Sequence, residues 1–186
     1  MKELTEDDVD KNIRQFIDYL EKNDALQLRT LSNNLIEVAM STEDQRVVDL
    51  SLISYTFSKM ITKPHLVETK DYENFKKKLI SVFIKQMEKN DTKKEMAHML
   101  DDTIDLIIDF DQNEGNYAIN IIEQARIKQA SRLYALGLSL SRAAEITNVN
   151  KNELLNYVGL TKIHERPFTQ SKKITERYKI AKQVLS

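Results

Sequence analysis

The first 114 residues contain no glycine, and this shortage limits the possible folds more than any other feature of the chain. The complete 186-residue sequence holds only three glycines and two prolines. These residues form the tight turns that a fold of many short strands needs between its strands. A chain with so few of them is better suited to long helices, so the sequence predicts an all-α protein.

Apolar residues recur every three or four positions through the N-terminal part, which is the pattern of amphipathic helices. We expect these helices over residues 9–20, 28–39, 47–61, 72–87 and 92–108. Asn23 and Asp24 are expected to separate the first two helices. The third is apolar on almost every side and is predicted to be the buried central helix. Ser41-Thr-Glu-Asp is expected to open it and Pro64 to end it. Lys76, Lys77 and Lys78 are expected on the outer face of the fourth.

The chain changes in character near DFDQNEGNY, residues 109–117, since all three glycines lie in the last 72 residues. We therefore predict two parts, an N-terminal helical bundle over residues 1–114 and a C-terminal domain over residues 115–186. Charge supports this division, because residues 123–186 carry 12 Lys and Arg against 5 Asp and Glu, whereas residues 1–122 carry 16 against 24. A basic part favours a phosphate-bearing partner. The alternative is that the two parts attract each other.

The stretch LSRAAEITNVNKNELLNYVG, residues 140–159, has the features of two short helices joined by a tight turn. A helix is predicted before it over 116–136, ended by Gly137, and another after it over 174–185. Ala143 and Ala144 are small enough for two helices to cross closely. Asn148 tolerates a positive φ, and Asn150 can cap the second helix. The inner face of that helix is expected to consist of Leu154, Leu155 and Val158.

These spacings resemble those of the helix-turn-helix family of DNA-binding domains, with Ala144, Asn148, Val149 and Leu154 at the diagnostic positions. More narrowly, residues 126–160 are similar to the C-terminal segment of small prokaryotic, archaeal-type antitoxin-like proteins. The resemblance implies a cytoplasmic DNA-binding regulator of transcription whose second helix reads bases in the major groove. A homodimer is expected, because helix-turn-helix proteins commonly pair two half-sites.

The expected nucleic-acid surface combines basic side chains for phosphates with Asn152 and Asn156 for base edges. The candidate residues are Arg126, Lys128, Arg132, Arg142, Lys151, Asn152, Asn156, Lys162, Arg166, Lys172, Lys173 and Arg177. The outer face of the second helix has one cation, one acid and no arginine. Two alternatives therefore remain open: a protein-interaction module of the antitoxin or adaptor kind, and a factor that binds structured RNA or the ribosome.

No catalytic or metal site is expected. Cysteine is absent and the three histidines are scattered, so no thiolate site, zinc set or catalytic triad can be assembled. We therefore expect no cofactor and no enzyme activity. The charged N-terminal sequence lacks the apolar region of a secretory signal, and no apolar run reaches the roughly 18 residues of a membrane span. These features indicate a cytoplasmic protein without a membrane partner.

Two acidic patterns have simpler explanations than metal binding. Glu95-Met-Ala-His98 matches half of a di-metal motif, but no second copy exists, so we expect a surface Glu and a partly buried His. Asp101, Asp105 and Asp109 share one helix face, which we expect to be solvated. An alternative is that this face imitates phosphate and docks on the basic C-terminal part.

Overall fold

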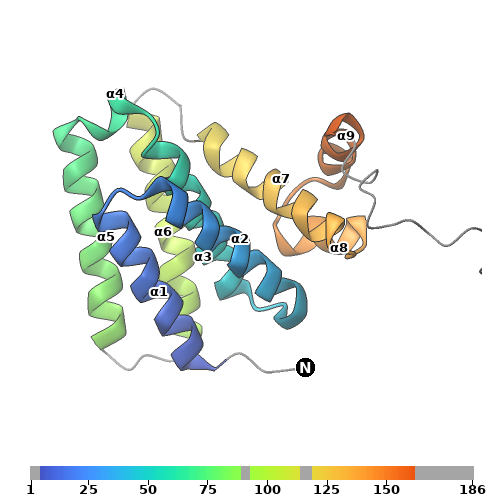
Figure 1. Ribbon diagram of the computed structural model, residues 1–186, viewed down its shortest axis with the longest axis horizontal. Helices are drawn as coiled ribbons and strands as arrows, with labels where there is room; N and C mark the ends of the chain where they lie inside the picture. Colours follow the sequence, from blue (N-terminus) through green and yellow to red (C-terminus); the bar gives the residue numbers. More distant parts are fainter. Residues whose placement is uncertain (1–4, 89–92, 114–118, 162–186) are drawn as a thin grey trace, which may run out of the picture.

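The computed structural model describes residues 5–88, 93–113 and 119–161, and every regular element in these ranges is a helix (Figure 1). The predicted all-α class is therefore confirmed. The elements are α1 (Glu6–Glu21), α2 (Ala25–Thr42), α3 (Gln45–Met60), α4 (Pro64–Val67), α5 (Lys70–Glu88), α6 (Lys93–Asn113), α7 (Ile119–Ala135), α8 (Leu140–Ile146) and α9 (Lys151–Thr161). None of these helices is long and apolar enough to cross a bilayer. The helix expected over 174–185 lies outside the described residues.

Helix α3 is the buried centre of the fold, as its apolar pattern predicted. Every residue from Arg46 to Ser58 is buried. Burial of hydroxyl groups is tolerated because they donate hydrogen bonds to the helix's own carbonyls. Ser54 donates to the carbonyl of Leu50 at 2.7 Å, and Thr56 donates to that of Leu52 at 2.8 Å. The other helices can therefore pack around α3 on all sides.

Aromatic side chains join α3 to the helices around it. The Phe16 ring of α1 meets Phe57 of α3 edge to face, with ring centroids 5.9 Å apart. Phe75 of α5 stacks on Phe110 of α6 at a centroid distance of 4.4 Å. Such pairs contribute beyond the burial of their area. Phe57 of α3 also stacks on Phe75 at a centroid distance of 6.1 Å, so these rings connect α1, α5 and α6 to the central helix.

The breaks between the first helices follow local sequence signals, with two corrections. Asn23 has φ 51° and the Asp24 carboxylate accepts a hydrogen bond from the backbone N–H of Gln27 at 3.0 Å, as expected of a break and a cap. Ser41 does not open α3, because α2 continues through Thr42. Asp44 caps α3 instead, accepting from the backbone N–H of Arg46 at 3.0 Å. Pro64 begins the short α4, since α3 has already ended at Met60.

Lys76 was predicted on the outer face of α5 but is buried. Its Nζ donates to Oδ1 of Asn23 at 3.1 Å and pairs with Glu73 at 2.8 Å. The long side chain therefore spans from α5 to the turn between α1 and α2. Lys77 and Lys78 are exposed as expected.

Helix α7 packs on α2 and α3 through a buried chain of hydrogen bonds. Gln129 of α7 donates through Nε2 to Oγ of Ser32 at 2.6 Å. The Ser32 hydroxyl donates to the carbonyl of Ser51 at 2.8 Å, and the Ser51 hydroxyl donates to the carbonyl of Ser32 at 2.9 Å. All three side chains are almost completely buried. The predicted boundary between residues 114 and 115 lies outside the described residues and stays a prediction.

We predict that Asp44→Ala destabilises the protein far more than Asp24→Ala, although both residues cap helices. Loss of the Asp24 cap should lower the free energy of unfolding by about 1 kcal/mol. Asp44 also forms an ion pair at 2.7 Å with Arg46, which is only 1% exposed, so its loss removes a close partner from a buried charge and should cost about 3–5 kcal/mol. Urea denaturation of the two variants measures both values. Equal losses would contradict a structural role for the Asp44–Arg46 pair.

Candidate functional site

The end of α7 and the start of α8 are set by local backbone interactions. Gly137 follows α7 with φ 116°, where a side chain would be strained. The backbone N–H of Leu138 donates to the carbonyl of Leu133 at 3.1 Å, which closes the helix end. The Ser139 hydroxyl then caps α8 by accepting from the backbone N–H of Arg142 at 3.2 Å. The chain therefore reverses between α7 and α8 within a few residues.

The turn between α8 and α9 has the backbone predicted from its sequence. Asn148 has φ 53°, in the left-handed region. The Asn150 side chain accepts from the backbone N–H of Asn152 at 2.8 Å and of Glu153 at 3.4 Å, so it caps α9 as expected. Ala143 and Ala144 are buried under the turn. Two short helices are thus joined with a small-residue contact between them.

Helix α9 buries one side and exposes the other. Leu154 and Val158 are buried, as expected, but Leu155 was predicted to face inward and is 55% exposed. One residue corresponds to roughly 100° around a helix, so Leu155 cannot share the buried side with Leu154. Lys151, Asn152, Glu153 and Asn156 are exposed with it, and Leu160 is 85% exposed. Figure 1 shows α9 beyond α7 and α8, away from α1 and α5.

Two of the predicted phosphate-binding arginines are paired with acids. Arg132 of α7 pairs with Glu37 of α2, and Arg142 of α8 pairs with Glu43 after α2. Arg142 also donates to Glu145 at 2.8 Å. The hydrogen bonds that Arg142 donates to Glu43 and then to Glu145 raise the pKa of Arg142, and the bond donated to Glu43 lowers the pKa of Glu43. These partners lie on or beside α2 and α8, so these two arginines are not paired with the α6 aspartates.

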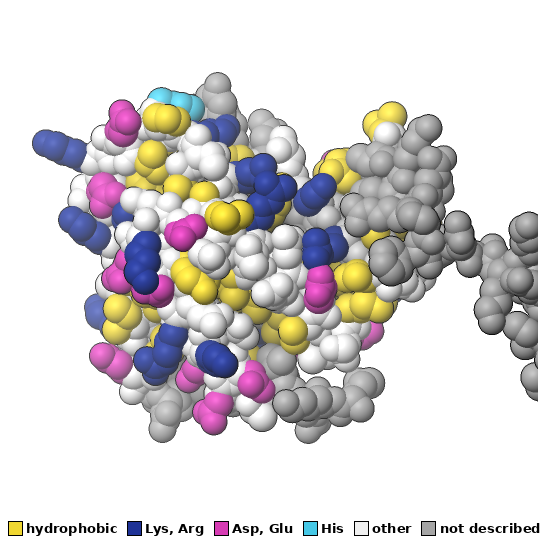
Figure 2. Space-filling model, in the orientation of Figure 1, with side chains coloured by type: hydrophobic (Ala, Val, Ile, Leu, Met, Phe, Trp, Pro, Cys, Tyr) yellow, Lys and Arg dark blue, Asp and Glu magenta, His cyan; other side chains and the backbone are white. Residues whose placement is uncertain are grey.

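The remaining candidates differ in how the structure places them. Lys128 is half-buried on α7, and Arg126 is half-buried with its side chain in a cleft described below. The candidates outside the described residues are Lys162, Arg166, Lys172, Lys173 and Arg177. On the face shown in Figure 2, basic and acidic side chains are intermixed over the bundle.

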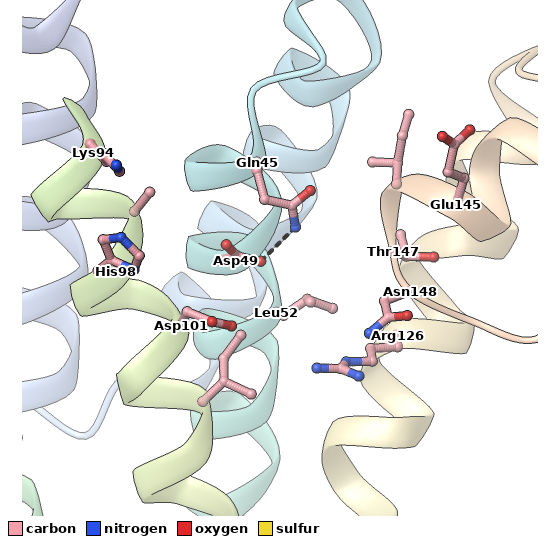
Figure 3. A pocket seen from close by; sticks show the side chains of 13 residues that line it. Gln45, Asp49, Leu52, Lys94, His98, Asp101, Arg126, Glu145, Thr147 and Asn148 are labelled. Atoms are coloured by element: carbon pink, nitrogen blue, oxygen red, sulfur yellow. Dashed lines mark hydrogen bonds between the residues drawn. The ribbon is translucent and has the colours of Figure 1, made fainter.

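A cleft of about 520 Å³ lies between the bundle and the turn after α8 (Figure 3). Asp49 of α3 and Asp101 of α6 lie on one wall, and Arg126 of α7 and Asn148 on the other. Asp49 accepts a hydrogen bond from Gln45 at 2.8 Å. Burial raises the pKa of Asp49 to about 6, and the nearby Asp101 adds to this rise. A carboxylate in the wall of a cleft is thus held without a closely bound cation.

The cleft was not predicted, although one signal for it was present in the sequence. Asp49 stands between Val48 and Leu50 in the segment predicted to be the buried central helix. Buried carboxylates are rare without a partner or a role, so an isolated acid in such a helix marks a position to inspect. Asp101 was noted only as part of the acidic face, and Arg126 only as a phosphate contact. The packing of α3, α6 and α7 brings Asp49, Asp101 and Arg126 to the same cleft.

The two acidic patterns of α6 do not form a metal site in the described structure. Asp101, Asp105 and Asp109 are exposed, which confirms a solvated face. His98 was expected to be partly buried but is exposed, because α6 directs it away from the core. No group of three or more His, Asp or Glu side chains suited to a metal ion occurs in the described ranges. Comparisons of the chain with protein-family models, curated proteins and solved structures gave no match.

Ionisation of Asp49 should make the protein less stable as pH rises. Because its folded-state pKa of about 6 lies above the ordinary 3.8, the folded protein holds this proton more tightly than the unfolded chain. The stabilisation is present at low pH and lost as pH rises through about 6, by up to about 3 kcal/mol. Asp49→Asn should therefore exceed the wild type in unfolding free energy at about pH 8 and lose that advantage near pH 4.

Urea denaturation across this pH range measures the difference between Asp49→Asn and the wild type. Asp102→Asn is the matched control, since Asp102 is exposed on α6 and does not line the cleft. Taking the difference between variants cancels the titration of the histidines. A difference that does not vary with pH would show that Asp49 titrates normally in the folded protein.

The turn after α8 should respond to substitution as a left-handed backbone does. Asn148→Gly should leave stability unchanged or raise it slightly, because glycine adopts φ 53° without strain. Asn148→Val should cost about 1–2 kcal/mol, because a β-branched residue is strained there. Thermal or urea unfolding measures both. If valine were tolerated as well as glycine, Asn148 would not be held in this conformation in solution.

Proposed function

We propose that this protein binds DNA through α8, its turn and α9, as a helix-turn-helix regulator of transcription. The supporting observation is the exposed polar face of α9, which carries Lys151, Asn152 and Asn156. This face stands on two short helices joined by a left-handed residue at Asn148. A recognition helix needs this combination, since it must be rigidly held and still free to enter the major groove.

The chemistry of the face suits contact with both phosphates and bases. Lys151 lies at the first position of α9, where its ammonium adds to the positive end of the helix dipole. Asn152 and Asn156 are one turn apart, and an asparagine amide can form two hydrogen bonds with adenine. Arg132 and Arg142 are already paired with Glu37, Glu43 and Glu145, so Lys151 is assigned the first phosphate contact.

A protein partner is the second candidate, favoured by the exposed leucines of α9. Leu155 and Leu160 are 55% and 85% exposed, and such apolar side chains are typical of contact surfaces rather than base readout. This second function is a docking helix of the adaptor or antitoxin kind. Binding of structured RNA remains a variant of the first function, in which shape and phosphates matter more than base edges.

Homodimerisation forms part of the proposal, because a single short recognition helix yields modest affinity and paired half-sites increase it. Sedimentation equilibrium of the full chain measures its oligomeric state directly. The dimer is expected to bind a two-fold symmetric site with half-sites about 34 Å apart. A monomer that still selected such a site would contradict this part of the proposal.

We predict that Asn156→Ala and Lys151→Gln weaken DNA binding in different ways. A random-sequence selection with the full chain first identifies the preferred site. Asn156→Ala should then lose roughly tenfold or more in affinity for that site and little for unrelated DNA, because it removes base contacts. Lys151→Gln should weaken both alike and reduce the salt slope by about 1, because it removes a phosphate contact.

Lys78→Gln is the control, since it removes an exposed cation from α5 of the bundle. Salt slopes for duplex DNA, single strands and structured RNA show which nucleic acid is preferred. No binding to any of them at about 50 mM salt, where phosphate contacts are strong, would reject the proposal and favour the protein partner. Equal losses from Lys78→Gln and Lys151→Gln would also contradict an interface on α9.

A further inference from the structure

The cleft between the bundle and the turn after α8 is lined by side chains of both charges. Asp49 and Asp101 come from α3 and α6, whereas Arg126 comes from α7. Figure 3 shows Arg126 and Asn148 facing the side on which Asp49 and Asp101 lie. Its volume of about 520 Å³ is within the usual range for small-molecule sites. Unlike charges that face each other across a cleft of this size can bind the two ends of one ligand.

Arg126 supplies evidence that a bonding partner is missing. Its Nε is buried and has no hydrogen-bond partner in the structure. Among the described residues, three other buried side-chain atoms share this property, but none of them belongs to a residue that lines this cleft. A buried, charged donor without an acceptor is costly. An anionic group bound in the cleft would give the Arg126 guanidinium an acceptor.

Lys94 of α6 also lines the cleft, but it is not among the charges that shift the pKa of Asp49. Asp49 accepts only a neutral hydrogen bond from Gln45, and its raised pKa reflects burial beside a second carboxylate rather than pairing with a positive charge. Arg126 lowers this pKa only weakly. A bound ammonium would offset the carboxylates of Asp49 and Asp101, as an ion pair does in a partly buried site.

The apolar residues that line the cleft determine which chemistry the uncharged part of the ligand can have. Leu52, Ile104 and Ile146 are buried apolar residues that line it, together with Ala97. A simple anion would face the carboxylates of Asp49, Asp101 and Glu145, and a simple cation would face Arg126 and Lys94. A ligand with both charges and an apolar side chain satisfies all three surfaces at once.

We propose that this cleft binds an α-amino acid with an aliphatic side chain. The carboxylate of the ligand accepts from Arg126 and from the Asn148 amide. Its ammonium donates to Asp101 and Asp49, and its side chain lies on Leu52 and Ile146. This site is independent of the proposed DNA contact, since none of its residues lies on α9. A bound amino acid would nevertheless contact Thr147 and Asn148. It would therefore connect the bundle to the turn that leads to α9.

Isothermal titration calorimetry of the full chain with L-leucine, L-isoleucine, L-valine and L-methionine tests the proposal. Two analogues of leucine separate the charges: 4-methylpentanoate lacks the ammonium, and 3-methylbutan-1-amine lacks the carboxylate. We expect saturable binding of at least one amino acid at one site per chain. For leucine, each analogue should bind roughly tenfold more weakly or worse, because it lacks a charge-assisted contact.

Substitutions of residues that line the cleft test whether the amino acid binds there. Arg126→Gln and Asp101→Asn should each weaken binding of the amino acid by roughly tenfold or more. Asp101 is exposed, so its variant tests the site even if Arg126→Gln affects folding. Arg29→Gln and Asp102→Asn remove matching charges from exposed positions outside the cleft and should have no effect. Circular dichroism melting of each variant checks that it is folded.

Three results would overturn the proposal. They are the absence of saturable binding by all four amino acids, an analogue with one charge that binds as tightly as leucine, and unchanged binding by both Arg126→Gln and Asp101→Asn. Loss of DNA binding by Asn156→Ala has no bearing on these results, because Asn156 lies outside the cleft. Failure of either proposal can therefore be recognised separately.

Discussion

The positions of α7, α8 and α9 depend on the buried hydrogen bonds between Gln129, Ser32 and Ser51. A buried amide or hydroxyl that loses its partner costs about 1–3 kcal/mol, so α7 can pack against α2 and α3 in few other registers. Short connections at Gly137 and Asn148 then carry α8 and α9 to fixed places. Both the exposed face of α9 and the cleft beside α3 follow from this one contact.

Electrostatic pairing joins the same two regions at the surface. Glu37 and Glu43 pair with Arg132 and Arg142, so cations that the linear sequence makes available to phosphate are neutralised within the protein. Exposed ion pairs contribute little stability and are weakened by salt. They do decide which cations can bind a partner. Because Arg132 and Arg142 are paired with acids, Lys151 at the first position of α9 is the cation assigned to a phosphate contact.

Asp49 is the exception to the apolar pattern of the central helix. Its burial costs stability above about pH 6, a penalty that a purely structural helix has no reason to carry. The same helix therefore supports the core through its apolar residues and presents a carboxylate to the cleft. Arg126 has the corresponding position on α7, between the core and the cleft. The two residues place a carboxylate and a guanidinium at the junction of the bundle and the C-terminal helices.

Sequence alone determined the helices, the caps at Asp24 and Asn150, and the left-handed turn at Asn148. These features depend on interactions within a few residues, so local spacing was sufficient to predict them. Only the tertiary structure decided that Lys76 is buried, that Arg142 pairs with Glu43, and that Asp49 and Arg126 line one cleft. In each of these cases the partners are far apart in sequence. Their meeting depends on how helices pack, which periodicity along a single chain does not specify.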